Sequence, residues 1–126
     1  MRFLIIVKAS AESEAGAMPA EGLIAKMAEF HEELARAGVL LDTSGLMPSS
    51  AGWRIRYEGE QRTLIDGPFA ETQELIAGYT LIQARSRDEA QAWTKRFPNP
   101  HGAGMMAEIE VRPVLGMEDF PPSTAC

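Results

Sequence analysis

The chain has 126 residues, a formal net charge of −6 and a hydrophobic share of 45%, a composition typical of one soluble globular domain. Its acidic charge, without any cluster of basic residues, excludes nucleic acid and anionic membrane surfaces as expected partners, because both carry negative charge. No stretch approaches the roughly 20 apolar residues of a membrane span. The single cysteine, Cys126, allows no disulfide within the chain, and we expect a cytoplasmic protein.

The first half of the chain predicts a strand, a loop, a helix and a second strand. Residues Arg2–Lys8 are rich in β-branched and aromatic side chains, which favours a strand, and their apolar run is too short for a secretory signal. The segment 9–20 shows no periodicity and predicts a loop. Apolar residues then recur at spacings that predict a helix ending near Gly38. This stripe consists of Leu23, Met27, Phe30, Leu34 and Ala37. Residues Val39–Leu46 predict the second strand.

The second half begins with the pattern of a hairpin. Residues 53–57 alternate, residues 58–60 can turn, and residues 62–65 can return as the partner strand. Arg54 and Arg56 lie on one face of this hairpin, where a salt-bridged surface is the default reading and anion capture the alternative. Residues 78–84 predict another strand.

A second helix and a last strand complete the chain. Ser86 and Glu89 have the spacing of a capping box, which predicts a helix start. The apolar stripe of this helix is Ala90, Trp93 and Phe97, and we expect it to face the core. Residues 108–114 alternate as a strand, and Pro113 predicts that this strand lies at a sheet edge, since proline cannot donate to a ladder.

The order of elements is β-α-β-hairpin-β-α-β. It predicts an α+β fold with the split βαβ arrangement of ferredoxin-like domains, of the dimeric α/β barrel type, with an inserted β-hairpin. We expect one domain over residues 1–115 and a loosely ordered C-terminal tail over residues 116–126.

The apolar content of the strands predicts a homodimer. In a split βαβ domain both helices cover the same sheet face, yet the first strand is apolar on both faces, with Leu4 and Ile6 opposite Phe3 and Ile5. A second copy joined by a two-fold axis would cover the bare face. The alternative is that the hairpin and the tail, which carry Trp53 and Phe120, fold back over it.

The segment 66–74 combines turn residues with carboxylates. Asp66 can accept a hydrogen bond from the backbone two residues on, Gly67 tolerates unusual φ angles, and Pro68 sets the exit direction. This reading describes a well-built turn and requires no function.

The same segment, Asp66–Glu74, resembles the signature of the DGPF branch of YciI-like proteins, usually read as DGPFAETKE. The further matches follow in the right order along the chain: Met1–Ala9, Leu75–Tyr79, Pro98–His101 and Ile109–Pro113. The resemblance implies a dimeric ferredoxin-like α/β fold in a small cytoplasmic bacterial protein. Some members are encoded beside extracytoplasmic-function sigma factors, and no general reaction is established for the family. Gln73 stands where the family usually has lysine.

The YciI branch of this family has a cleft pair formed by a histidine on the first helix and an aspartate in the loop after the second helix. We expect that this pair does not transfer to the present chain. His31 lies out of step with the helix position, so we interpret it as a surface histidine, and the later loop carries Asn99 and His101.

The candidate site residues follow from these patterns. Asp66 and His101 are the candidate catalytic residues, because a carboxylate and an imidazole can act as acid and base. Lys8, Glu71 and Tyr79 are the candidate binding residues. For His101 and Lys8 the alternative is a solvated side chain without a role.

No metal or cofactor is expected. Two distant histidines and a terminal cysteine lack metal-ligand spacing, and neither a dinucleotide loop nor a nucleophile elbow is present. The sequence favours a protein that binds or converts a small molecule near the Asp66 turn. The alternative is a non-catalytic regulatory or interaction module, linked to sigma-factor signalling.

Overall fold

The computed structural model describes residues 1–121, apart from the side chain of Gln73. In this part of the chain the strands are β1 (Arg2–Lys8), β2 (Leu40–Gly45), β3 (Trp53–Glu58), β4 (Gln61–Asp66), β5 (Ile76–Gln83) and β6 (Ile109–Pro113). The α-helices are α1 (Ala11–Glu14), α2 (Glu21–Arg36) and α3 (Arg87–Thr94). Short 3₁₀ turns are formed by Ser49–Ala51 (η1), Thr72–Glu74 (η2) and Met117–Asp119 (η3).

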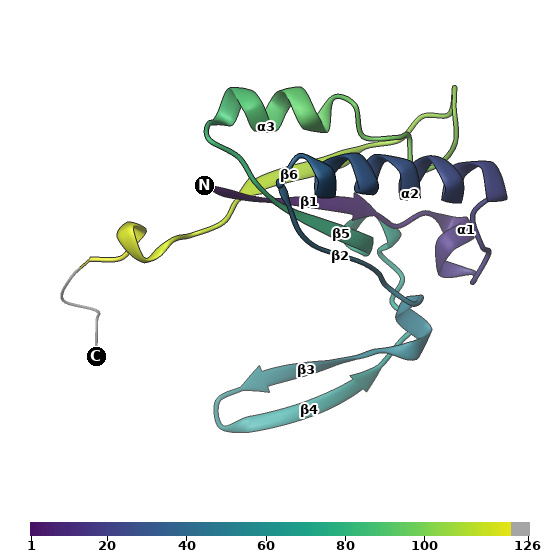
Figure 1. The fold of residues 1–126 in the computed structure, drawn as a ribbon. Helices are drawn as coiled ribbons and strands as arrows, with labels where there is room; N and C mark the ends of the chain where they lie inside the picture. The colour runs from purple at the N-terminus through teal and green to yellow at the C-terminus, as the bar shows by residue number, and fades with distance from the viewer. Residues whose placement is uncertain (122–126) are drawn as a thin grey trace.

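The described residues form a four-stranded sheet in the order β2-β5-β1-β6 and, apart from it, the two-stranded sheet β3-β4. β1 runs antiparallel to β5 and β6, and β2 runs antiparallel to β5. Figure 1 shows α2 and α3 on the same side of the four-stranded sheet. This is the split βαβ arrangement, so the predicted α+β ferredoxin-like fold is confirmed. β6, which ends at Pro113, lies at a sheet edge as predicted.

The helix α1 lies within the segment predicted as a loop. The Ser10 hydroxyl accepts a hydrogen bond from the Ser13 N–H at 3.1 Å, and the Ser13 hydroxyl accepts one from the Ser10 N–H at 2.8 Å. Two serines thus satisfy N–H groups at the helix start reciprocally. The prediction of a loop was wrong here because a four-residue helix is too short to show apolar periodicity.

The core lies between the four-stranded sheet and the helices that cover it. Its buried side chains are Phe3, Ile5, Phe30, Leu34, Val39, Ile82, Ala84 and Ala90. Trp93 and Phe97 are half-buried and pack against this cluster, with ring centroids 6.3 Å and 5.6 Å from that of Phe30. The predicted stripe of the second helix therefore faces the core, and its two aromatic residues lie at the rim.

The β3–β4 hairpin extends away from the four-stranded sheet (Figure 1). Its strands are joined by a turn in which Gly59 has a φ of 61°, a conformation that glycine adopts without strain. Trp53 on the hairpin is 63% exposed and Phe120 in the tail is 50% exposed. The described chain therefore does not adopt the alternative in which these two segments cover its own sheet.

The predicted tail is described only in part. Residues 116–121 contain the η3 turn, in which the Gly116 N–H donates to Oδ2 of Asp119 at 2.7 Å. The rest of the predicted tail, residues 122–126, lies outside the described residues.

Candidate functional site

A cavity of about 250 Å³ lies between α2 and the end of the sheet where β1 and β2 finish and β5 begins. The residues that bring chemistry or apolar surface to its wall include Leu23, Met27, His31, Thr43, Thr80 and His101. Its volume is below the roughly 300–1,000 Å³ of pockets for drug-sized ligands, so the cavity suits a small molecule.

His31 projects from α2 into a hydrogen-bonded group of side chains in this cavity. Its Nε2 atom lies 2.7 Å from the Thr80 hydroxyl and 3.1 Å from the Thr43 hydroxyl. Its Nδ1 atom lies 2.7 Å from the carbonyl oxygen of Met27. Because a carbonyl oxygen only accepts, this contact assigns a hydrogen to Nδ1 and leaves Nε2 as the atom facing the hydroxyls.

The interpretation of His31 as a surface residue was wrong. The side chain is half-buried, and its ring packs edge-on against Phe97 with centroids 6.1 Å apart. His31 follows Met27 by one spacing of four, and residues spaced in this way lie on the same face of a helix. The spacing was visible in the sequence, although the sequence did not show that this part of the face borders a cavity.

Thr80 and Thr43 lie side by side against Nε2 of His31. Thr80 is 1% exposed, and its hydroxyl lies 3.0 Å from that of Thr43, which is exposed. The Thr43 hydroxyl also donates to the backbone carbonyl of Tyr79 at 3.1 Å. With the Thr43 hydrogen directed to that carbonyl, the Thr80 hydroxyl can donate its single hydrogen to Nε2 of His31.

His101 lines the same cavity from the loop after α3, and its side chain is exposed. Its ring Nδ1 atom lies 3.1 Å from the carbonyl oxygen of Met106. The backbone N–H of His101 donates to Oδ1 of Asn99 at 2.9 Å. The Asn99 amide in turn donates to the Met105 carbonyl at 2.7 Å. The loop thus orients the ring through Nδ1, the nitrogen that His31 also directs to a backbone carbonyl.

Lys8 and Tyr79 also line the cavity, but their polar ends bind elsewhere. The Lys8 ammonium lies 3.3 Å from Oε1 of Glu110, and this contact lowers the pKa of Glu110. The Tyr79 hydroxyl donates to Oδ2 of Asp42 at 2.8 Å. Successive side chains of a strand point to opposite faces, so the Tyr79 ring lies on the face opposite to Thr80. We conclude that the backbone of Tyr79 forms part of the cavity wall.

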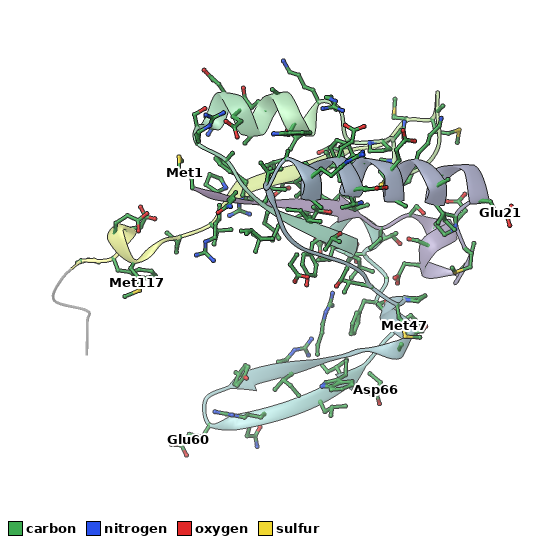
Figure 2. The ribbon with its side chains drawn as sticks, in the orientation of Figure 1. Met1, Glu21, Met47, Glu60, Asp66 and Met117 are labelled. Carbon is green, nitrogen blue, oxygen red and sulfur yellow. The ribbon has the colours of Figure 1, made fainter. Side chains whose placement is uncertain are left out.

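Asp66 and Glu71 are exposed and do not belong to the cavity wall. Figure 2 shows Asp66 on the hairpin, apart from the helix-covered sheet. The structure therefore does not bring Asp66 and His101 together within one chain.

The predicted hydrogen bond from a backbone N–H to the Asp66 carboxylate is absent among the described residues. The residue two positions on is Pro68, which carries no N–H, and the Phe69 N–H donates to the Ser49 hydroxyl at 3.1 Å. This part of the turn prediction was wrong because a neighbouring segment supplies the acceptor.

Gly67 is required by close packing and not, as predicted, by its φ angle, which lies outside the positive range. A Cβ atom at this position would lie 1.9 Å from the backbone oxygen of Ser49, too close for any side chain. The Gly67 N–H also donates to the carbonyl of Gly52 at 3.0 Å. The turn that precedes β3 and the turn that follows β4 are thereby held together.

Glu14 of α1 fastens this pair of turns to the domain. Its carboxylate accepts hydrogen bonds from the Ser49 hydroxyl and from the Ser49 N–H, the latter at 2.9 Å. These bonds lower the pKa of Glu14. The 66–69 segment therefore has a structural role at the base of the hairpin.

Within residues 1–121, no group of three or more histidine, cysteine, aspartate or glutamate side chains could hold a metal ion. No helix in the same range is long and apolar enough to cross a membrane.

Comparison with known proteins gives three findings. The family model described as "YCII-related domain" matches residues 1–115. An uncharacterized protein of Rhizobium meliloti (strain 1021) is 30% identical over 94 residues, which cover 75% of this chain and 74% of the relative. The fold is also similar to 5-chloro-2-hydroxyhydroquinone dehydrochlorinase from Burkholderia phenoliruptrix AC1100, solved in complex with 2,5-dihydroxybenzoquinone. That likeness has 17% identity, coverage of 94% and 97% of the two chains, and a TM-score of 0.46. The predicted family is confirmed at the level of the YCII-related domain, and the DGPF branch stays a prediction.

Proposed function

We propose that this chain, which belongs to the family of YCII-related domains, binds or converts a small molecule in the cavity lined by His31 and His101. The observation that carries the proposal is the contact of 2.7 Å between Nε2 of His31 and the Thr80 hydroxyl. Because Nδ1 is bound to a carbonyl and Nε2 faces two hydroxyls, the ring has a fixed orientation, and Nε2 is its basic nitrogen for proton transfer.

The chemistry of the cavity wall narrows the ligand. Among the described residues of the wall, aliphatic and aromatic side chains are joined by hydroxyls and two imidazoles, and carboxylates are absent. A carboxylate-free wall in an acidic protein tolerates an anionic group on the ligand. We propose a small, largely apolar molecule that carries an acidic or hydrogen-bonding group. His31 would accept or return its proton, with His101 at the mouth.

A ligand-observed NMR screen of small carboxylic acids and phenols tests this proposal. We expect some compounds to show saturation transfer, and therefore binding, with the wild-type protein and not with His31→Gln. Glutamine fills similar space but has no basic nitrogen. Glu71→Gln serves as the matched control, since Glu71 lies outside the cavity wall. Hits that bind equally well to both variants would contradict the assignment to this cavity.

The same screen addresses the second candidate function, a non-catalytic regulatory or interaction module that includes a role in sigma-factor signalling. The exposed apolar residues of the hairpin favour it, because such a patch marks an interaction surface. A screen that finds no ligand for the cavity, combined with hairpin variants that no longer act in sigma-factor signalling, would support this second function over the first.

We also propose that the protein is a cytoplasmic homodimer. On the sheet face away from α2 and α3, the apolar side chains of Leu4, Ile6 and Leu81 are half-buried, which leaves apolar area for a second copy. Light scattering behind gel filtration measures the mass. The mass of two chains is expected for the wild-type protein, and a lower mass for Leu81→Lys. A wild-type mass of one chain at micromolar concentration would overturn the proposal.

A further inference from the structure

The β3–β4 hairpin has one apolar face that its own chain leaves uncovered. In the register of the two strands, Trp53 pairs with Asp66, Ile55 with Leu64, and Tyr57 with Arg62. Directly paired residues of antiparallel strands point to the same face. The exposed fractions are 63% for Trp53, 41% for Ile55, 64% for Tyr57 and 57% for Leu64. This set, with Arg62 and Asp66, is called the apolar hairpin face below.

The opposite hairpin face is polar and partly covered. It carries Arg54, Arg56 and Glu58, paired with Ile65, Thr63 and Gln61. The Arg54 guanidinium lies 3.7 Å from the centroid of the Phe69 ring, and Ile65 is half-buried. The hairpin is therefore amphipathic, with the large exposed side chains gathered on one side. A two-stranded hairpin that stands alone is at best marginally stable in water, so the apolar face requires a cover.

The charges on the apolar hairpin face indicate what this cover is. Arg62 lies at the end near the hairpin turn and Asp66 at the end near the base. Among the described residues neither side chain makes an ion pair, and Arg62 contacts only the Tyr57 ring, 5.0 Å from its centroid. The face therefore has one cation and one anion at opposite ends of an apolar centre, which is a self-complementary pattern.

We infer that the apolar hairpin face packs against the same face of a second copy of this chain. The two-fold axis lies between the two hairpin faces, parallel to them and perpendicular to the strands. The strands of the two copies then run in opposite directions, and Arg62 of each copy lies opposite Asp66 of the partner subunit. The same axis places Trp53 opposite Tyr57 of the partner subunit. It also places Ile55 opposite Ile55 of the partner subunit and Leu64 opposite Leu64 of the partner subunit. The contacts between Arg62 and Asp66 and between Trp53 and Tyr57 therefore occur twice, as in an isologous interface, and Ile55 and Leu64 each meet their own counterpart on the axis. Paired aromatic rings and an apolar centre with charged ends are typical of stable interfaces.

This inference goes beyond the proposed function and is independent of the cavity. It assigns Asp66 to recognition of the partner subunit, in place of the catalytic role expected from the sequence. The apolar hairpin face is also separate from the outer face of the four-stranded sheet. A mass of two chains agrees with both contacts when one two-fold axis makes them together. The mass alone does not separate the two contacts, but charge reversal on the hairpin does, because Arg62 and Asp66 belong only to the hairpin.

Sedimentation velocity over a range of protein concentrations tests the interface. Arg62→Asp places two carboxylates opposite each other in both halves of the interface, and Asp66→Arg does the same with two cations. Like charges in contact repel each other, so we expect the dissociation constant to rise at least about tenfold in each variant. In the double variant Arg62→Asp/Asp66→Arg the opposite charges are restored with their positions exchanged, and association should recover.

The matched controls are Arg56→Asp and Glu58→Arg, which make the same charge changes on the polar hairpin face and should leave association unchanged. Circular dichroism checks that every variant folds. The inference is overturned by a wild-type protein that stays monomeric, by single variants that associate as well as the controls, or by a double variant that stays dissociated. A cross-link from Trp53 to the four-stranded sheet of another copy would overturn it as well, since the hairpin would then have a different occupant.

Discussion

The hydroxyl of Thr80 on β5 lies 2.7 Å from Nε2 of His31 on α2, and the two residues are far apart in the sequence. Because Thr80 is 1% exposed, its hydroxyl has no ready replacement partner in water. The pair joins the helix layer to the sheet layer at the wall of the cavity. It therefore contributes both to the fold and to the chemistry proposed for the site.

We expect Thr80→Val to destabilise the protein by about 0.5–1.5 kcal/mol, because Nε2 of the half-buried His31 loses its shorter hydrogen-bond contact and keeps only the one with Thr43. Thr80→Ser keeps the hydroxyl and should cost less. Urea unfolding measures both, and Thr63→Val on the exposed hairpin is the control for the substitution itself. Equal stability of the three variants would show that the contact with His31 contributes nothing to the fold.

The contact between Glu14 and Ser49 predicts a pH dependence of stability. The hydrogen bonds from the Ser49 hydroxyl and N–H lower the pKa of Glu14 below its ordinary value of 4.5. A folded-state pKa below the unfolded one means that the unfolded chain binds this proton more tightly. The stabilisation is therefore complete above the unfolded pKa and is lost as the pH falls through the folded pKa.

Thermal unfolding between neutral and acidic pH measures this dependence. We expect Glu14→Gln to be less stable than the wild-type protein near neutral pH and to lose less stability on acidification below pH 4.5. Glu12→Gln removes a carboxylate from the same short helix and should keep the wild-type profile. A profile of Glu14→Gln that parallels the wild type would argue against the contact with Ser49.

The close approach at Gly67 predicts a cost for any side chain there. We expect Gly67→Ala to destabilise the protein by about 1–3 kcal/mol or more, as overpacking usually does, because the new methyl group meets the Ser49 carbonyl. The control is Gly22→Ala within α2, where the added Cβ has open space. That change should stabilise the helix by about 0.5–1 kcal/mol. Denaturant midpoints that move in the same direction in both variants would contradict the packing at Gly67.

The aromatic cluster predicts a graded response at the core. Phe30 is 5% exposed, so Phe30→Ala should cost about 3–5 kcal/mol. Trp93 is half-buried, and Trp93→Ala should cost measurably less than this while still exceeding Met18→Ala, whose side chain is 82% exposed. Urea unfolding of the three variants gives the order. A negligible shift for Trp93→Ala would place this residue outside the core contacts.

The elements of the fold were open to prediction because their signals are local. Alternation in residues 53–57 and the stripe from Leu23 to Ala37 depend only on the repeat of a strand and of a helix. The position of Pro113 was likewise enough to predict an edge strand. The four-residue helix α1 was missed, since its signal consists of two serines and no periodic pattern.

The site was open to prediction only in part. His101, Lys8 and Tyr79 were named from the sequence and do line the cavity, whereas Asp66 and Glu71 do not. Thr80 and Thr43 were missed because nothing in their local sequence distinguishes them from ordinary strand residues. They meet at neighbouring positions of β2 and β5, and the register of these strands contains an irregularity between Leu40 and Asp42.

By itself, the sequence determined the order of the strands and of the helices α2 and α3, and the split βαβ arrangement, because these depend on repeat lengths and on a small set of allowed connections. The family followed from the resemblance of residues 66–74 and of the matching segments along the chain. Only the tertiary structure decided that His31 reaches Thr80 and that the base of the hairpin is held by Gly67 and Ser49. It also decided that Asp66 lies on an exposed apolar face. The physical reason is that contacts between distant segments depend on strand register and on the space between layers, and a one-residue change in register reverses the face of every side chain.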